Sequence, residues 1–111
     1  MISESLRDTP DLSFSPLATT DIKQTWDYLS ERGYEVAENF IRSIIQICGT
    51  IAQNPLIGRD RSDLIVRLRQ FPYKNYNIFY FQIENGVEIY RILHSSRDQV
   101  QVFKDAIDDN N

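Results

Sequence analysis

Hydrophobic residues recur at three- and four-residue spacing across residues 35–53, and this pattern predicts the longest helix of the chain. Its apolar face consists of Ala37, Phe40, Ile41, Ile44, Ile47, Cys48 and Ile51. Asn54-Pro55 ends the helix, because a residue that precedes proline disfavours helical backbone. Gly49 lies inside it, where glycine costs about 1 kcal/mol relative to alanine, so we expect a close packing contact there.

A shorter helix is predicted ahead of it, with Ile22, Trp26 and Leu29 on one face. Thr19 or Thr20 is expected to cap this helix, which places Asp21 in the favourable first turn. Arg32-Gly33 is a typical C-terminal signal, so the link to the next helix is short. The two helices therefore predict an antiparallel hairpin.

The ends of the chain differ from this central part. Residues 12–15 alternate apolar and polar side chains, which predicts a short first strand that Pro16 ends. Residues 1–11 are polar without periodicity and are expected to form a flexible lead-in, and residues 104–111 form an acidic tail. Residues 12–103 are then a single domain.

Three aromatic-rich segments, at residues 64–71, 76–83 and 87–94, predict a three-stranded antiparallel meander after a polar loop at residues 56–63. Residues 99–107 add a short C-terminal helix or strand. The fold class is therefore α+β, in the order strand, helical hairpin, meander and C-terminal element.

The register of the last two strands follows from the turn between them. Asn85-Gly86 is typical of a two-residue hairpin turn, because both residue types tolerate positive φ. Counting outward pairs Phe79 with Ile92 and Phe81 with Tyr90 on one side of the sheet. The other side pairs Tyr80 with Arg91, and we expect the arginine to stack over the ring.

Each predicted strand is apolar on both faces, and the helical hairpin covers only one of them. The opposite face, with Phe79, Phe81, Tyr90 and Ile92, would be an apolar patch on the order of several hundred Å², a size typical of interaction sites. Two alternatives are open at this point. Either a protein partner covers this face, or the C-terminal segment folds over it.

Composition limits the class of protein. The chain has 111 residues, 41% of them hydrophobic and 25% charged, which is ordinary for one globular domain. Neither a membrane span nor a secretory signal is apparent in the sequence, and the lone Cys48 is expected to be a buried free thiol, so we expect a cytoplasmic protein. The net charge of −4 disfavours non-specific nucleic-acid binding.

No pattern typical of catalysis is present. The single histidine, His94, has no nucleophile or carboxylate at a recognisable spacing, and one histidine with one cysteine is too few for a zinc site. The glycines form no phosphate loop. We therefore predict no catalytic residue, metal or cofactor. The arginines of the strand half, among them Arg69 and Arg97, fit either a contact surface or salt bridges to the acidic helices.

From about Leu12 to Asp98 the chain resembles the ParE-like toxins of the RelE/ParE superfamily of bacterial toxin–antitoxin systems. The resemblance rests on the order and spacing of several short segments rather than on any one of them. These are residues 12–18, Trp26-Asp27-Tyr28, Asn54-Pro55, Gly58-Arg59, Arg69-Gln70-Phe71-Pro72, residues 76–80, Arg91-Ile92-Leu93-His94 and Arg97-Asp98.

The resemblance implies a ParD-like antitoxin that wraps the toxin, and DNA gyrase as the target of a binding toxin. The apolar face makes Phe79, Phe81, Tyr90 and Ile92 the candidates for antitoxin contact. The candidates for target contact are Arg69, His94, Arg97 and Phe103.

Two alternatives accompany this hypothesis. One is a RelE-like, ribosome-dependent mRNA endoribonuclease, but the chain has Asn77 where those enzymes tend to carry arginine and Phe103 near their tyrosine. A phenyl ring cannot transfer a proton. The other alternative is an inactive module that binds only its antitoxin. The long lead-in and the acidic tail also differ from the usual ParE pattern.

Overall fold

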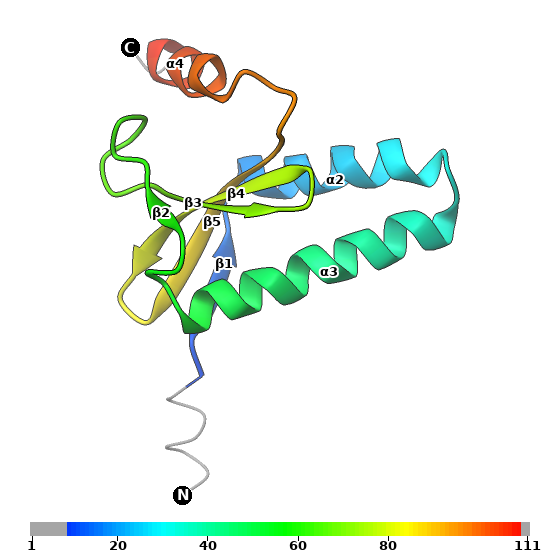
Figure 1. Cartoon of the computed structure of the whole chain (residues 1–111), viewed down its shortest axis with the longest axis horizontal. Helices are drawn as coiled ribbons and strands as arrows, with labels where there is room; N and C mark the ends of the chain where they lie inside the picture. The colour runs from blue at the N-terminus through cyan, green and yellow to red at the C-terminus, as the bar shows by residue number, and fades with distance from the viewer. Residues whose placement is uncertain (1–8, 110–111) are drawn as a thin grey trace, which may run out of the picture.

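The computed structural model describes residues 9–109 of the protein, and the side chains of residues 9–105. The elements in chain order are β1 (Asp11–Phe14), α2 (Pro16–Ser30), α3 (Tyr34–Gln53), β2 (Arg59–Asp60), β3 (Arg69–Tyr73), β4 (Tyr76–Ile83), β5 (Gly86–His94) and α4 (Gln99–Asp109). They form one five-stranded sheet in the order β1-β5-β4-β3-β2. Only β1 pairs in parallel, with β5. The predicted α+β fold is confirmed, and the hairpin of α2 and α3 lies on one side of the sheet (Figure 1).

The helix α2 begins three residues before the predicted cap. Ser15 is its N-cap, and the Ser15 hydroxyl accepts a hydrogen bond from the Ala18 amide at 3.0 Å. Pro16 starts the helix because its missing N–H has no partner to lose at that position. The prediction of a cap at Thr19 or Thr20 is therefore wrong. The prediction of α3 is confirmed to within one residue at its start.

The strand β3 is shorter than predicted. It begins at Arg69, because residues 61–68 form a series of turns in which Arg67 has a φ of 70°. These turns do not form a strand. Their apolar side chains Leu64, Ile65 and Leu68 pack in the cluster that contains Phe103 of α4. At the other end of the chain, Asp11 lies in β1, and residues 104–109 of the predicted acidic tail belong to α4.

The hairpin of β4 and β5 turns one residue earlier than predicted. Ile83 pairs with Gly86, so the loop consists of Glu84 and Asn85. The turn pattern predicts Gly86 for its tolerance of positive φ, but the structure requires glycine there because of a close contact. A Cβ atom at this position would lie 1.9 Å from the Asp11 carbonyl oxygen. The first strand passes too close to allow a side chain.

A bulge then shifts the register again. Tyr80 pairs with Ile89 but Phe79 pairs with Arg91, which leaves Tyr90 as the extra residue of β5. All the cross-strand pairs predicted by counting outward from Asn85-Gly86 are therefore wrong. The bulge also changes the faces: Ile92 points to the helical hairpin instead of sharing a face with Phe79.

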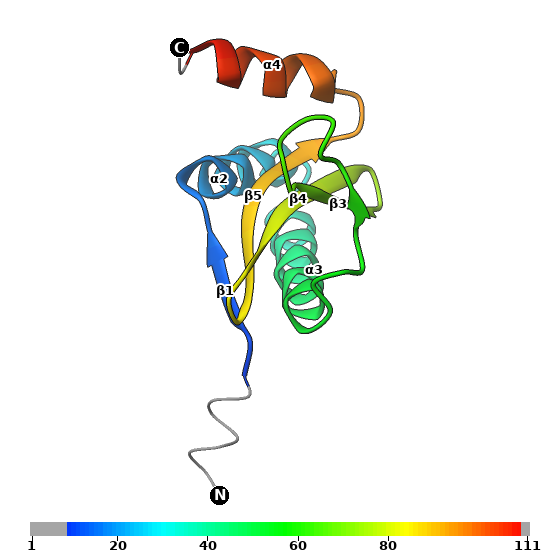
Figure 2. The same cartoon turned by 90° about the vertical axis from the view of Figure 1, so that its left-hand side faces the viewer.

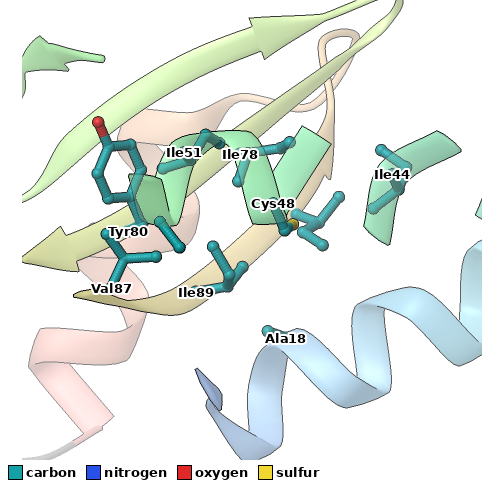
Figure 3. Close-up of a cluster of buried hydrophobic side chains, with 10 residues drawn as sticks. Ala18, Ile44, Cys48, Ile51, Ile78, Tyr80, Val87 and Ile89 are labelled. Atoms are coloured by element: carbon teal, nitrogen blue, oxygen red, sulfur yellow. The ribbon is translucent and has the colours of Figure 1, made fainter. Parts of the chain in front are cut away.

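The main core lies between the sheet and the helical hairpin. Figure 3 shows Ala18 of α2 and Ile44, Cys48 and Ile51 of α3 meeting the strand residues Ile78, Tyr80, Val87 and Ile89. All eight side chains are buried. A Cβ atom added to Gly49 would have no neighbour within 4 Å, so the close contact expected there is absent.

A second, smaller core fills the opposite face of the sheet. Phe103 of α4 is 1% exposed, and its ring lies 4.8 Å from Phe79 and 6.0 Å from Tyr90, centroid to centroid. Figure 2 shows α4 running across the end of the sheet that bears the residue 61–68 loop. The C-terminal segment therefore folds over this face, which was one of the two alternatives left open by the sequence.

A buried ion pair joins α2 to β5. Asp21 is 5% exposed, and its carboxylate accepts hydrogen bonds from Arg91 Nε at 2.8 Å, from Arg91 Nη2 at 3.0 Å and from the Ile92 amide at 2.9 Å. The hydrogen bonds that Arg91 donates to the Asp21 carboxylate raise the pKa of Arg91 above its ordinary value. Arg91 therefore does not stack over Tyr80 as predicted, because the bulge turns it toward α2.

The loop after α3 is fixed by Tyr80 and Arg69. The buried Tyr80 hydroxyl accepts from the Gly58 amide and donates to the Pro55 carbonyl, both at 2.8 Å. The Arg69 guanidinium donates to the carbonyl oxygens of Leu56 and Gly58. A Cβ atom on Gly58 would lie 2.7 Å from the Tyr80 hydroxyl, so only glycine fits without a shift.

The two glycines Gly58 and Gly49 form a matched pair for a test of this loop. Gly58→Ala should lower the free energy of unfolding by about 1–3 kcal/mol, since the new methyl group displaces the Tyr80 hydroxyl or the Gln70 backbone. Gly49→Ala should raise it by about 0.5–1 kcal/mol, because alanine is the better helix former and space is free. Urea unfolding monitored by fluorescence measures both. Equal effects of the two changes would contradict the tight contact at Gly58.

Removing one partner of the ion pair should destabilise the protein more than removing both partners. Asp21→Ala should destabilise the protein by about 3–5 kcal/mol, because it leaves the Arg91 charge buried without its partner. The double change Asp21→Ala with Arg91→Met should restore a large part of that loss, since neither charge is then buried. Thermal and urea unfolding of the two variants would decide. A double variant less stable than Asp21→Ala would show that the arginine contributes mainly through packing.

Candidate functional site

A groove between α2 and the C-terminal end of β5 brings together two of the predicted target-contact residues, His94 and Arg97. Its volume is about 330 Å³. The lining residues are Asp21, Gln24, Thr25, Tyr28, Tyr76, Ile92, Leu93, His94, Ser96 and Arg97. The groove is thus built from a helix near the start of the chain and from the last strand with the turn that follows it.

The position of His94 is fixed by its neighbours. It is the last residue of β5, pairs with Tyr76 of β4, and meets the Tyr76 ring edge to face at a centroid distance of 5.1 Å. The Ser96 amide donates a hydrogen bond to His94 Nδ1 at 3.0 Å, and the Ser96 hydroxyl lies 2.7 Å from the same nitrogen. The imidazole is therefore held in one orientation.

Arg97 follows in the turn after β5. Its amide donates to the His94 carbonyl at 3.1 Å, which keeps the turn tight. Its side chain is exposed, and the guanidinium makes no hydrogen bond or ion pair with any residue from 9 to 105. A cation without a partner at the mouth of a groove is available for a ligand.

The other two target-contact candidates lie elsewhere. Arg69 binds the Leu56 and Gly58 carbonyls and lines a separate hollow with Asp60, Gln82 and Glu84. Phe103 is buried between Phe79 and Tyr90. Both residues therefore have a structural role in this arrangement, and the structure does not bring the four candidates together.

The four antitoxin-contact candidates do not share one surface of the sheet. Phe79 is fully buried under Phe103, and Ile92 lies on the other side of the sheet at 3% exposure. Phe81 and Tyr90 are partly exposed, with their rings edge to face at 5.4 Å. The single apolar patch expected from the sequence is wrong, because the bulge turns Ile92 away and α4 covers Phe79.

Sequence reasoning missed the outer face of the helical hairpin. A shallow hollow there is lined by Trp26, Ile41 and Ile45, with Glu38 and Arg42 paired beside it at 2.6 Å. The signal was present, since isoleucine at both positions 41 and 45 makes the apolar stripe of α3 wider than one buried face requires.

The described residues also bear on metal binding and on the chemistry of the single thiol. Residues 9–109 contain no group of three or more His, Cys, Asp or Glu side chains that could hold a metal ion. Burial raises the pKa of the Cys48 thiol to about 12, so the buried free cysteine that was predicted carries no thiolate near neutral pH. None of the helices within residues 9–109 is long and apolar enough to cross a membrane.

Comparisons with known proteins agree with this fold. A family model for the ParE toxin of the type II toxin–antitoxin system parDE matches residues 12–99. Toxin ParE1 of Mycobacterium tuberculosis, in strains CDC 1551 / Oshkosh and H37Rv, is 28% identical over 86 residues, which cover 76% of this chain and 88% of that protein. The solved structure of the chromosomal ParDE TA system from P. aeruginosa is similar in fold, with a TM-score of 0.65 and 17% identity over 78% of this chain and 97% of that one. Because the family match spans the sheet and the helical hairpin, this chain belongs to the ParE toxin family of type II toxin–antitoxin systems.

Proposed function

We propose that this ParE-family toxin is neutralised by a ParD-like antitoxin and that it stops growth by binding DNA gyrase in the cytoplasm. The observation that carries the proposal is the family match across residues 12–99, on a fold that the ParDE structure shares. The groove supports a binding role, since its described lining offers an exposed guanidinium, a fixed imidazole and several hydroxyl groups.

The surface proposed for the antitoxin centres on Phe81 and Tyr90. These two rings are adjacent and partly exposed, which leaves apolar area beside Phe103 of α4 that a partner segment can bury. Contact with Phe79 would first require removal of Phe103 from its place. The antitoxin segment is expected to order as it binds, as is usual for extended protein segments that wrap a partner.

The groove with His94 and Arg97 is proposed for the cellular target. Neither Phe81 nor Tyr90 lines this groove, so a different partner can occupy each surface. Arg69 and Phe103 are left out of this site, because both are engaged within the fold.

A RelE-like ribonuclease has less support. Asn77 is buried and accepts a hydrogen bond from the Gln70 side chain at 2.8 Å, so this position offers no charge to a phosphate. Phe103 lies in the second core and has no group that exchanges a proton. An inactive module that binds only its antitoxin is the other alternative.

Induced expression without an antitoxin separates these functions. Gyrase poisoning should produce double-strand DNA breaks and loss of negative supercoiling, whereas a ribonuclease should arrest translation and leave cleaved messages. Normal growth with normal amounts of folded protein would support the inactive module and contradict the proposal.

Arg97→Ala should reduce growth arrest while antitoxin binding persists. The change removes a free charge at the groove and little packing, so the free energy of unfolding should change by no more than about 0.5 kcal/mol. Growth after induction and gyrase supercoiling assays measure the effect. Arg59→Ala, at an exposed position in β2, is the matched control. Equal toxicity of the Arg97→Ala and wild-type chains would remove Arg97 from the target site.

Phe81→Ala should weaken binding of the ParD-like antitoxin by about tenfold or more, because it removes an aromatic ring from the proposed contact surface. Calorimetric titration with the protein encoded beside the toxin gene measures the dissociation constant. Val66→Ala is the control, since Val66 is 74% exposed on the turns before β3. Circular dichroism must show that both variants are folded. Unchanged affinity of the folded Phe81→Ala chain would place the antitoxin elsewhere.

A further inference from the structure

We infer that the groove between α2 and β5 recognises one carboxylate group, carried by an acidic side chain next to a large apolar residue of a protein partner. The ligand chemistry follows from the groove itself. Only the choice of a protein as the carrier of the carboxylate rests on the proposed function.

Among the residues with described side chains, Asp21 is the one acid that lines the groove, and it is already paired with a cation. Asp21 accepts two hydrogen bonds from Arg91 and one from the Ile92 amide, so both carboxylate oxygens have partners. The charges of Asp21 and Arg91 cancel. Arg97 then gives the groove a net positive charge of its own, without a partner among residues 9–105.

His94 adds a hydrogen-bond donor. Its Nδ1 atom faces the Ser96 amide, which can only donate, so Nδ1 must be the acceptor of the 3.0 Å hydrogen bond. In the neutral ring the proton is then on Nε2. The Ser96 hydroxyl, 2.7 Å from Nδ1, is compatible with this tautomer because it can donate as well. The ring therefore presents an N–H group through its free nitrogen.

Hydroxyl groups extend the set of donors. The Tyr28 hydroxyl accepts from Arg32 Nη2 at 2.9 Å, which leaves its own proton free to donate. Thr25 lies one turn of α2 away from Tyr28 and also lines the groove. A guanidinium, an imidazole N–H and hydroxyl donors around one hollow match the acceptor oxygens of a carboxylate.

Apart from the amide of Gln24, the rest of the lining is apolar. Ile92 and Leu93 are 3% and 1% exposed and form part of the wall, and the Tyr76 ring stands beside His94. A volume of about 330 Å³ suits one or two side chains. An acidic residue next to a large apolar residue fills both parts of the groove. Nucleic acid is a poorer match, because its binding depends on many cations, and among the residues with described side chains Arg97 is the one unpaired cation that lines this groove, on a chain of net charge −4.

Nuclear magnetic resonance titration of the ¹⁵N-labelled full chain tests the inference. The probes are N-acetyl-Phe-Glu-amide, the matched N-acetyl-Phe-Gln-amide, inorganic phosphate and uridine 5′-monophosphate. The glutamate peptide should shift the amide signals of Ser96 and Arg97 and the ring signals of His94. It should bind about tenfold more tightly than the glutamine peptide, because only the carboxylate makes charge-assisted hydrogen bonds.

Arg97→Gln should abolish the difference between the two peptides, and Arg59→Gln should preserve it. The ¹⁵N shifts of the free protein should show His94 Nδ1 without a proton. Equal affinity for both peptides, no shift with the glutamate peptide in the millimolar range, or a proton on Nδ1 would overturn the inference. Tighter binding of uridine monophosphate at the same residues would assign the groove to nucleotides instead. Toxicity is measured separately, so loss of peptide binding in a chain that still arrests growth rejects only this inference.

Discussion

The ion pair between Asp21 and Arg91 determines how the helical hairpin meets the sheet. One carboxylate receives two hydrogen bonds from the guanidinium and a third from the backbone of β5. Removing each of the two charges from water costs several kcal/mol. The three hydrogen bonds to the Asp21 carboxylate and the attraction between the charges offset this cost. The pair lies directly after the bulge at Tyr90, and the register shift at the bulge sets which strand residues face α2 and which face α4.

Much of the fold could be predicted because it depends on local periodicity. The isoleucine stripe of α3, the hairpin of α2 and α3 and the antiparallel meander all follow from spacing within each segment. The register of β5 could not be predicted in the same way. It depends on Gly86, where β1 passes too close for a side chain, and on the bulge at Tyr90. The residue after the bulge, Arg91, bonds to Asp21, which lies seventy residues earlier in the sequence.

The part of the groove that comes from one short segment could be predicted, and the part that comes from a distant helix could not. His94 and Arg97 are close in sequence, so their proximity in the groove follows from one turn. The α2 wall with Tyr28 could not be found, since a polar helix face has no periodic signal. Several segments that carry the family resemblance have structural roles instead: Asn54-Pro55 and Gly58-Arg59 include the loop that Tyr80 and Arg69 hold.

The pairing of the first strand with the last has a consequence for synthesis of the protein. Ser15 donates to the Tyr90 carbonyl across 75 positions of sequence, and among the strands of residues 9–109 β1 neighbours β5 alone. A ribosome must therefore release nearly the whole domain before β1 finds its place or Asp21 meets its arginine. Such long-range contacts close late, because loop entropy opposes them until many shorter contacts exist. A prematurely terminated chain that ends in β4 contains most of the helices but neither the groove nor the ion pair.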